Sequence, residues 1–201
     1  MELCVGTLAD RIVGKTKRNH NPAWWGDAPE KLAAAFSYTR NLAVQLCEGL
    51  RTIHDAGYMH RDLKLINILV TKDNTVKLAD FGLTKREVNI TGTVAGTLLY
   101  AAPEVKEEGK MYDKSADIYS LGLILWEMWY GRTLYGIQDS TYIKHMEEDL
   151  KKGRDFKMPR WEGTVTPIPE WTRLIHDCLK KDPRERPKIQ KCLDRISAMK
   201  V

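Results

Sequence analysis

Four polar side chains have the types and spacing needed for phosphoryl transfer assisted by magnesium. Asp62, Lys64 and Asn67 lie in one short stretch, and Asp80 follows further along the chain. A carboxylate can accept the proton of an attacking hydroxyl, and carboxylate and amide oxygens are ligands that Mg²⁺ prefers. A lysine can offset negative charge on the phosphoryl group that moves. These residues therefore predict a site for this chemistry.

The stretch between these residues is predicted to be a β-hairpin over residues 66–79. Residues 66–70 are largely apolar and β-branched, a Lys-Asp-Asn turn follows, and residues 76–78 alternate apolar with polar side chains. A hairpin reverses the chain direction. We therefore expect Asp80 to return beside Asp62 and Asn67, so that two carboxylates and an amide share one magnesium site.

Most of the remaining chain is predicted to be helical. Apolar residues recur at helical spacing, and Gly57 is placed to end the first long helix. Residues 13–29 are polar and punctuated by Gly and Pro, which indicates a loop. The predicted helices cover residues 30–55, 115–131, 140–152, 168–180 and 187–199. The predicted fold class is mainly α (α+β overall), with a small β-hairpin at the active-site cleft.

The composition excludes several classes of protein. The chain has 201 residues, 43% hydrophobic and 29% charged, and its net charge of +5 comes from basic residues interleaved with acidic ones. We therefore expect no nucleic-acid partner. The longest apolar stretch, residues 121–126, is too short to cross a bilayer, and the first residues do not resemble a signal peptide. The four cysteines form no Cys-x-x-Cys pair, so we expect reduced thiols and a cytoplasmic or nuclear location.

Three short motifs resemble those of eukaryotic protein kinases. Residues 60–67 read HRDLKLIN, residues 80–82 read DFG and residues 102–104 read APE. They are similar to the family's catalytic loop, metal-binding motif and activation-segment end, in the family's order. One such triplet is weak evidence, but all three in order arise by chance only about once in a hundred thousand such chains.

The resemblance extends over essentially the whole chain and implies a protein kinase-like fold. Residues 1–7 resemble the hinge, residues 58–70 the catalytic loop and its strand, residues 80–104 the activation segment, and residues 105–201 the helical subdomain. Residues 1–201 would then form the helical large lobe, or C-lobe, of a protein kinase domain.

The resemblance also implies roles in binding and catalysis, with ATP and Mg²⁺ as cofactors. Asp62 would orient or deprotonate the substrate hydroxyl, and Lys64 would stabilise the γ-phosphate. Asn67 and Asp80 would hold magnesium. The nucleotide-binding residues would be Glu2, Cys4, Leu69 and Asp80.

Other residues are expected to be structural by the same resemblance. His60 and Phe81 would pack together in the regulatory spine, anchored by Asp117. Glu104 and Arg186 would form a buried ion pair that ties the activation segment to the lower helices.

Regulation and specificity are expected to depend on the activation segment. Arg61 needs a counter-charge if it is partly buried, and Thr93 matches the position that commonly carries a phosphate, with Thr91 as a rival site. Lys64 and Thr97 resemble the serine/threonine-specific pattern, with tyrosine specificity as an alternative. The implied partners are a protein substrate with Ser or Thr, and an upstream kinase.

One departure from the family is large. The chain contains no Gly-rich loop, no strand lysine of the Val-Ala-Ile-Lys type and no partnered helix glutamate, which together mark the small lobe. Three explanations stay open: a partial sequence of a complete kinase, a truncated product that acts as a scaffold or decoy, or half of a split protein. The intact motifs favour the first, because a pure binding module has no need for magnesium ligands.

Overall fold

The computed structural model describes residues 3–13, 29–86, 90–91, 99–107, 111–134, 148 and 166–200. The helices are α1 (Leu8–Val13), α2 (Pro29–Asp55), α3 (Pro103–Lys106), α4 (Ser115–Tyr130), α6 (Pro169–Cys178) and α7 (Ile189–Ala198). The 3-10 turns are η1 (Leu65–Asn67), η2 (Phe81–Leu83) and η4 (Pro183–Glu185). The strands are β1 (Cys4–Thr7), β2 (Tyr58–Met59), β3 (Ile68–Thr71), β4 (Val76–Leu78), β5 (Lys85–Arg86), β6 (Ile90–Thr91) and β7 (Met111–Tyr112).

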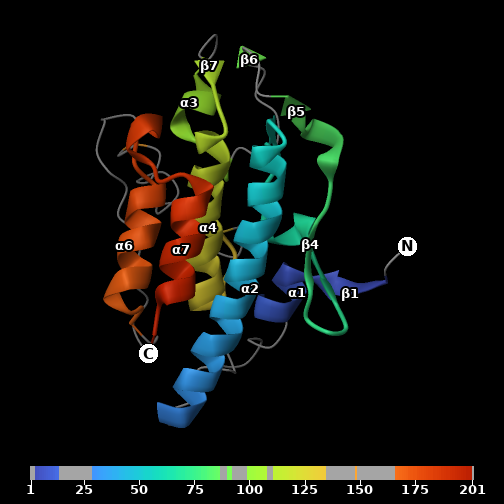
Figure 1. The fold of residues 1–201 in the computed structure, drawn as a ribbon, viewed down its shortest axis with the longest axis vertical. Coiled ribbons are helices and arrows are strands. Elements are labelled where there is room, and N and C mark those ends of the chain that lie inside the picture. The colour runs from blue at the N-terminus through green and yellow to red at the C-terminus, as the bar shows by residue number, and fades with distance from the viewer. Residues whose placement is uncertain are drawn as a thin grey trace.

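The long helices lie side by side and form most of the molecule (Figure 1). Helix α2 packs along α7, and α4 packs along α6. Every residue of α4 from Asp117 to Tyr130 is buried, as expected for a helix that is apolar on nearly all sides. This arrangement confirms the mainly helical fold class with small antiparallel sheets.

Most of the predicted helices are present. The predictions for residues 30–55, 115–131, 168–180 and 187–199 correspond to α2, α4, α6 and α7. Gly57 follows α2 with a φ of 79°, a left-handed conformation that favours glycine, so it ends the helix as predicted. The predicted helix over residues 140–152 lies outside the described residues except for position 148. Helix α1 was not predicted, because six residues are too few to show a helical period.

The sheets are small and antiparallel. The sheet of β1, β3 and β4 lies beside α2, and the β6–β7 pair lies near α3 at the top of the view (Figure 1). Strands β3 and β4 form the predicted hairpin, although its first residues form the turn η1 instead of strand. Strand β1 pairs with the other edge of β3, which brings Cys4 opposite Thr71 and Thr7 opposite Leu69. Two shorter pairs join β2 to β5 and β6 to β7.

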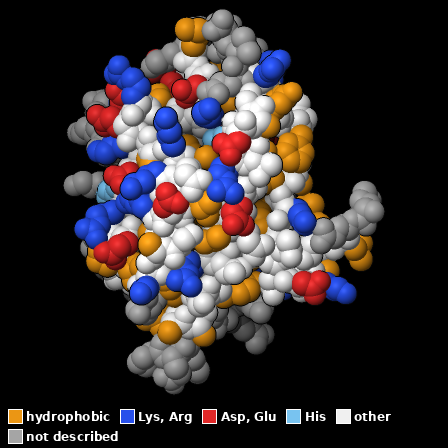
Figure 2. Space-filling model, in the orientation of Figure 1, with side chains coloured by type: hydrophobic (Ala, Val, Ile, Leu, Met, Phe, Trp, Pro, Cys, Tyr) orange, Lys and Arg blue, Asp and Glu red, His pale blue; other side chains and the backbone are white. Residues whose placement is uncertain are grey.

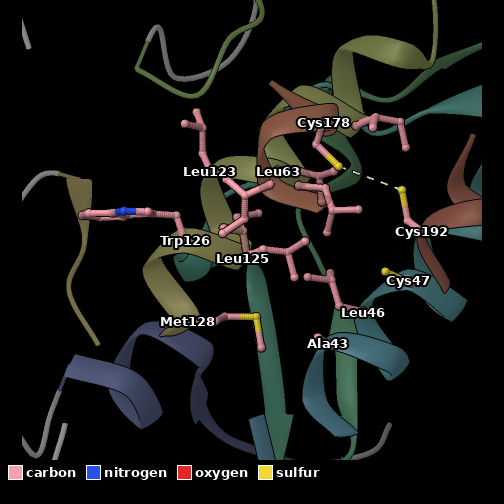
Figure 3. Close-up of a cluster of buried hydrophobic side chains, with 14 of the residues drawn as sticks. Ala43, Leu46, Cys47, Leu63, Leu123, Leu125, Trp126, Met128, Cys178 and Cys192 are labelled. Atoms are coloured by element: carbon pink, nitrogen blue, oxygen red, sulfur yellow. Dashed lines mark hydrogen bonds between the residues drawn. The ribbon is translucent and has the colours of Figure 1, made fainter. Parts of the chain in front are cut away.

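A group of buried thiols lies in the core where α2, α6 and α7 meet (Figure 3). The Sγ atoms of Cys178 and Cys192 are 4.0 Å apart, and Cys47 is also buried. The hydrogen bond to Cys192, together with burial, raises the pKa of the Cys178 thiol, and burial raises the pKa of the Cys47 thiol. All four cysteines are free, as predicted, and the three buried thiols are packing groups.

Basic and acidic side chains are mixed over the face of the molecule shown in Figure 2. This face therefore presents no single-sign patch of the kind that binds nucleic acid. None of the helices in the described part of the chain has both the length and the apolar character needed to cross a membrane.

Candidate active site

The loop between β2 and β3, residues 60–67, gathers three of the predicted side chains around one carboxylate. Lys64 Nζ lies 2.7 Å from Oδ2 of Asp62. Asn67 Nδ2 donates to the same oxygen at 2.9 Å and to the Asp62 carbonyl, also at 2.9 Å. Asp62 and Asn67 are buried, which strengthens hydrogen bonds to a charged acceptor. The carboxylate is therefore held in one orientation.

The hairpin returns the chain to the 60–67 loop at Ala79, the residue before Asp80. The Ala79 N–H donates to the Asn67 carbonyl at 2.9 Å, and the Ala79 carbonyl lies 3.0 Å from Nε2 of His60. Asp80 follows directly, with a left-handed φ of 63° and an exposed carboxylate. A non-glycine residue in this conformation is strained, and such strain is concentrated at functional sites.

The available oxygen donors suit magnesium. Asn67 uses its amide nitrogen to bind Asp62, and its Oδ1 accepts no hydrogen bond from a described residue. The Asp80 carboxylate likewise has no hydrogen-bond or ion-pair partner among the described residues. Mg²⁺ is usually bound through one or two carboxylates together with phosphate oxygens and water. Within the described ranges, no three His, Cys, Asp or Glu side chains form a metal cluster, so a magnesium ion here would also need ligands from its substrate.

Asp117 fastens the 60–67 loop to the buried helix α4. Its carboxylate accepts hydrogen bonds from the backbone N–H groups of His60 at 2.8 Å and Arg61 at 2.9 Å, and it lies 2.9 Å from Nε2 of His54. Arg61 itself has a left-handed φ of 70°. Three contacts from one side chain thus hold the strained backbone that precedes Asp62.

The expected packing of His60 against Phe81 is present. Their ring centroids are 5.4 Å apart with an interplanar angle of 48°. Phe81 nevertheless remains 51% exposed. An aromatic ring that is open on one side can take a further apolar neighbour there.

The predicted ion pair between Arg186 and Glu104 is also present. Arg186 Nη1 and Nη2 donate to Oε1 and Oε2 of Glu104 at 2.6 and 2.8 Å, and both side chains are buried. The guanidinium also donates to the carbonyls of Lys180 and Ser115, at 2.8 and 3.0 Å. Arg186 therefore connects α3, which contains the last residues of the predicted activation segment, to the start of α4 and the approach to η4.

Two interactions were not found by sequence reasoning. Arg61 Nη2 donates to the Tyr112 hydroxyl, and Nη1 donates to the Leu83 carbonyl at 3.3 Å. Tyr100 donates its hydroxyl to Glu127 Oε1, which also accepts the Leu134 N–H at 2.7 Å. The Tyr100–Glu127 contact could have been suspected, because Glu127 is an acidic residue in the apolar second half of its helix. The Arg61–Tyr112 contact could not, because Tyr112 lies in a strand of two residues, which leaves no pattern in the sequence.

Burial changes the ionisation of Glu127. Removal from water raises the pKa of this carboxyl to about 8, although the hydrogen bonds from Tyr100 and Leu134 oppose the shift. Its Oε2 is buried and has no hydrogen-bond partner in the part of the chain that the structure describes. Glu127 is therefore largely protonated at neutral pH.

The predicted nucleotide-binding and regulatory residues are only partly described. Cys4 and Leu69 are half-buried and lie on the neighbouring strands β1 and β3. Leu3 and Val5, on either side of Cys4, are 82% and 53% exposed. Glu2, Thr93 and Thr97 lie outside the described residues, and of Thr91 only the backbone strand is described.

Comparison with known proteins agrees with this geometry. The sequence profile of the protein kinase domain (Pkinase) matches residues 2–196. A dual serine/threonine and tyrosine protein kinase of Takifugu rubripes is 32% identical over 149 residues, which are 73% of this chain and 15% of the relative. Serine/threonine-protein kinase Nek9 of Xenopus laevis is 34% identical over 158 residues, which are 75% of this chain and 16% of the relative. The chain thus spans about a sixth of the length of these curated relatives.

Proposed function

Because the chain belongs to the protein kinase family, we propose that it is the large lobe of a serine/threonine kinase. The reaction is transfer of the γ-phosphate of ATP to serine or threonine hydroxyls of a protein substrate. The observation that carries the proposal is the buried Asp62 carboxylate, held by Lys64 and Asn67, with the exposed Asp80 following Ala79, whose N–H donates to the Asn67 carbonyl. A purely structural cluster has no need for this combination of a fixed base and open oxygen donors.

Each side chain has a role that its contacts support. Asp62 orients the substrate hydroxyl and accepts its proton, since two donors fix the direction of its carboxylate. Lys64 places a positive charge 2.7 Å from that carboxylate, where it offsets charge on the phosphoryl group. Asn67 Oδ1 and the Asp80 carboxylate would hold magnesium, which neutralises charge on the phosphate oxygens when bound.

The nucleotide base would lie over β1 and β3. Cys4 and Glu2 would bind the adenine edge through backbone groups, and Leu69 would offer an apolar surface beneath the ring. Leu3 and Val5, on either side of Cys4, are exposed apolar side chains, and so is Phe81, directly after Asp80. We infer that a small lobe covers them in the active protein and completes the nucleotide site.

Regulation would act through Arg61. A phosphate on Thr93 would add charge-assisted hydrogen bonds to this guanidinium and order the activation segment. Thr93→Ala should then lower activity and make residues 83–100 more sensitive to protease. Equal activity and equal protease sensitivity would rule out this role. The phosphate would come from an upstream kinase.

The location of the protein is a separate point. The four free cysteines favour a cytoplasmic or nuclear location, where thiols stay reduced.

Lys64 and Thr97 support serine/threonine specificity. The relatives include kinases named for both serine/threonine and tyrosine activity, so phosphoamino-acid analysis of the product separates the two. Phosphotyrosine as the main product would contradict the proposal.

The exposed apolar residues also favour a second function. A lobe with Leu3, Val5 and Phe81 open to solvent can act as a scaffold or decoy that binds another protein and transfers no phosphate. In that case, partner binding would not depend on Asp62 or Asp80.

The test is ATP-dependent phosphorylation by the full-length protein and by Asp62→Asn and Asp80→Ala variants. Asp73→Asn is the matched control, because this aspartate is exposed in the hairpin turn away from the cluster. We expect loss of activity in both site variants and wild-type activity in the control. Partner binding that survives both changes, without phosphate transfer by the wild type, would support the scaffold function instead.

A further inference from the structure

The guanidinium of Arg61 is held between two elements that belong to different parts of the chain. Nη1 donates to the carbonyl of Leu83 in η2, and Nη2 donates to the hydroxyl of Tyr112 in β7. The guanidinium carbon also lies 5.5 Å from the centre of the Tyr112 ring. Tyr112 therefore contacts Arg61 both through its hydroxyl and through its ring.

The position of Tyr112 depends on the segment that follows Asp80. Strand β7 pairs with β6, with Ile90 opposite Tyr112 and Thr91 opposite Met111. Tyr112 is buried, so its ring is fixed by packing as well as by this pairing. A change in the β6–β7 pair thus alters where the hydroxyl lies.

The main chain of Arg61 is tethered separately. Its N–H donates to Asp117, and its φ of 70° is a strained conformation that persists only when the surroundings impose it. Arg61 directly precedes Asp62. With one tether on the main chain and two hydrogen bonds on the side chain, we expect a shift of the Arg61 side chain to change the strain in the backbone that carries the Asp62 carboxylate.

The guanidinium has space to move if the hydroxyl is removed. Arg61 and Tyr112 line one pocket together with Ala101, Ala102 and Val105. The small alanine side chains leave room on one side of the arginine. The hydrogen bonds of Arg61, to Tyr112 and to Leu83, then set the direction of the guanidinium more than crowding does, and the Tyr112 bond fixes Nη2.

We propose that Tyr112 is a positioning residue that keeps Asp62 in its catalytic orientation through Arg61, and that it couples this orientation to the β6–β7 pair. The inference rests on the proposed kinase function. Tyr112 has no contact with Asp62, Lys64 or Asn67 in the described interactions, so its effect reaches the site through the arginine.

The test compares Tyr112→Phe with Tyr38→Phe in the full-length protein. Phenylalanine keeps the ring and removes only the hydroxyl, and Tyr38 in α2 serves as the control because its hydroxyl donates to Oδ1 of Asn74 in the hairpin turn, away from Asp62. For Tyr112→Phe we expect about a tenfold fall in kcat, the effect of losing one hydrogen bond to a charged group, with KM for ATP and peptide unchanged within about twofold. For Tyr38→Phe we expect wild-type values.

Two further measurements show whether Arg61 carries the effect. In an Arg61→Ala background, Tyr112→Phe should lower kcat no further, because the interacting group is already gone. Amide hydrogen exchange should become faster in residues 58–67 of Tyr112→Phe and stay unchanged in α4, which reports on correct folding.

The outcomes separate this inference from the proposed function. A Tyr112→Phe variant that matches Tyr38→Phe in kcat and exchange would overturn the inference, and so would an additive loss in the Arg61→Ala background. Wild-type protein that transfers no phosphate would refute the proposed function, while faster exchange in residues 58–67 would still support the link from Tyr112 to this loop.

Discussion

Arg186 and Glu104 are 82 positions apart in the sequence and form a two-pronged ion pair in the core. The arginine side chain is fully buried and the glutamate nearly so. The pair joins the short helix α3 to the region just before α7. Each charge is acceptable in this environment only because the other is present.

Glu104→Gln should strongly destabilise the protein. The substitution keeps the size of the side chain but leaves the buried guanidinium without its counter-charge. We expect the free energy of unfolding in urea to fall by about 3 to 5 kcal/mol. Glu170→Gln is the control, because Glu170 pairs with Arg173 at the surface, and it should cost less than about 1 kcal/mol. Equal losses in the free energy of unfolding for the two substitutions would show that the buried pair stabilises the protein no more than the surface pair does.

Asp117→Asn should weaken both the fold and the 60–67 loop. The carboxylate faces three N–H groups, from His54, His60 and Arg61. Asparagine offers one oxygen and turns an NH₂ group toward the remaining donors. We expect a loss of about 2 to 4 kcal/mol in urea unfolding, from hydrogen bonds to a charged group. Phosphate transfer should also fall.

Asp113→Asn is the matched control for that substitution. Asp113 is exposed and accepts the Ser115 N–H at 2.8 Å, a contact that asparagine can also make. Its unfolding curve should overlap that of the wild type. An Asp117→Asn curve that overlaps as well would argue against a clamping role for Asp117.

Most of this site could be predicted because its residues lie close together in the sequence, where one turn or one hairpin decides their arrangement. Asp62, Lys64 and Asn67 are brought together by one turn, and the hairpin that returns Asp80 has a clear alternating pattern. The long amphipathic or apolar helices were predicted for the same reason. The ion pair of Arg186 and Glu104 spans a long distance, and only the family resemblance indicated it.

Other features could not be predicted because their causes are not local. The Arg61–Tyr112 contact depends on β6 and β7, which have two residues each and no recognisable pattern. The raised pKa of Glu127 depends on how deeply α4 is buried, which is decided by the helices packed around it. The strained φ of Asp80 likewise follows from the Ala79 hydrogen bonds rather than from the residue type.

Glu127 should make stability fall as pH rises. Its pKa is about 8 in the folded protein and 4.5 when unperturbed, so the folded state keeps its proton over this interval and the unfolded state does not. The stabilisation is complete below pH 4.5 and is lost as pH rises to about 8. From the size of the shift, the loss is on the order of 5 kcal/mol.

Glu127→Gln should remove this dependence, because glutamine resembles the protonated acid and does not titrate. The measurement is urea unfolding at several pH values, with the difference between wild type and variant plotted against pH. Glu48→Gln, an exposed change on α2, should run parallel to the wild type. If Glu127→Gln also runs parallel, Glu127 does not carry a raised pKa.

Gly122→Ala should destabilise the contact between α4 and α6. A Cβ at Gly122 would lie 2.7 Å from the Cβ of Cys178 and 3.2 Å from the Leu179 side chain, so the two helices would have to move apart. We expect a loss of about 1 to 3 kcal/mol in urea unfolding, even though alanine favours helix by about 1 kcal/mol over glycine. Gly49→Ala is the control, because its Cβ would meet only the tip of Leu78 at 3.3 Å, which can rotate away. The control should be neutral or slightly stabilising, and an equal response of the two sites would show that α4 and α6 pack less closely at Gly122 than this distance requires.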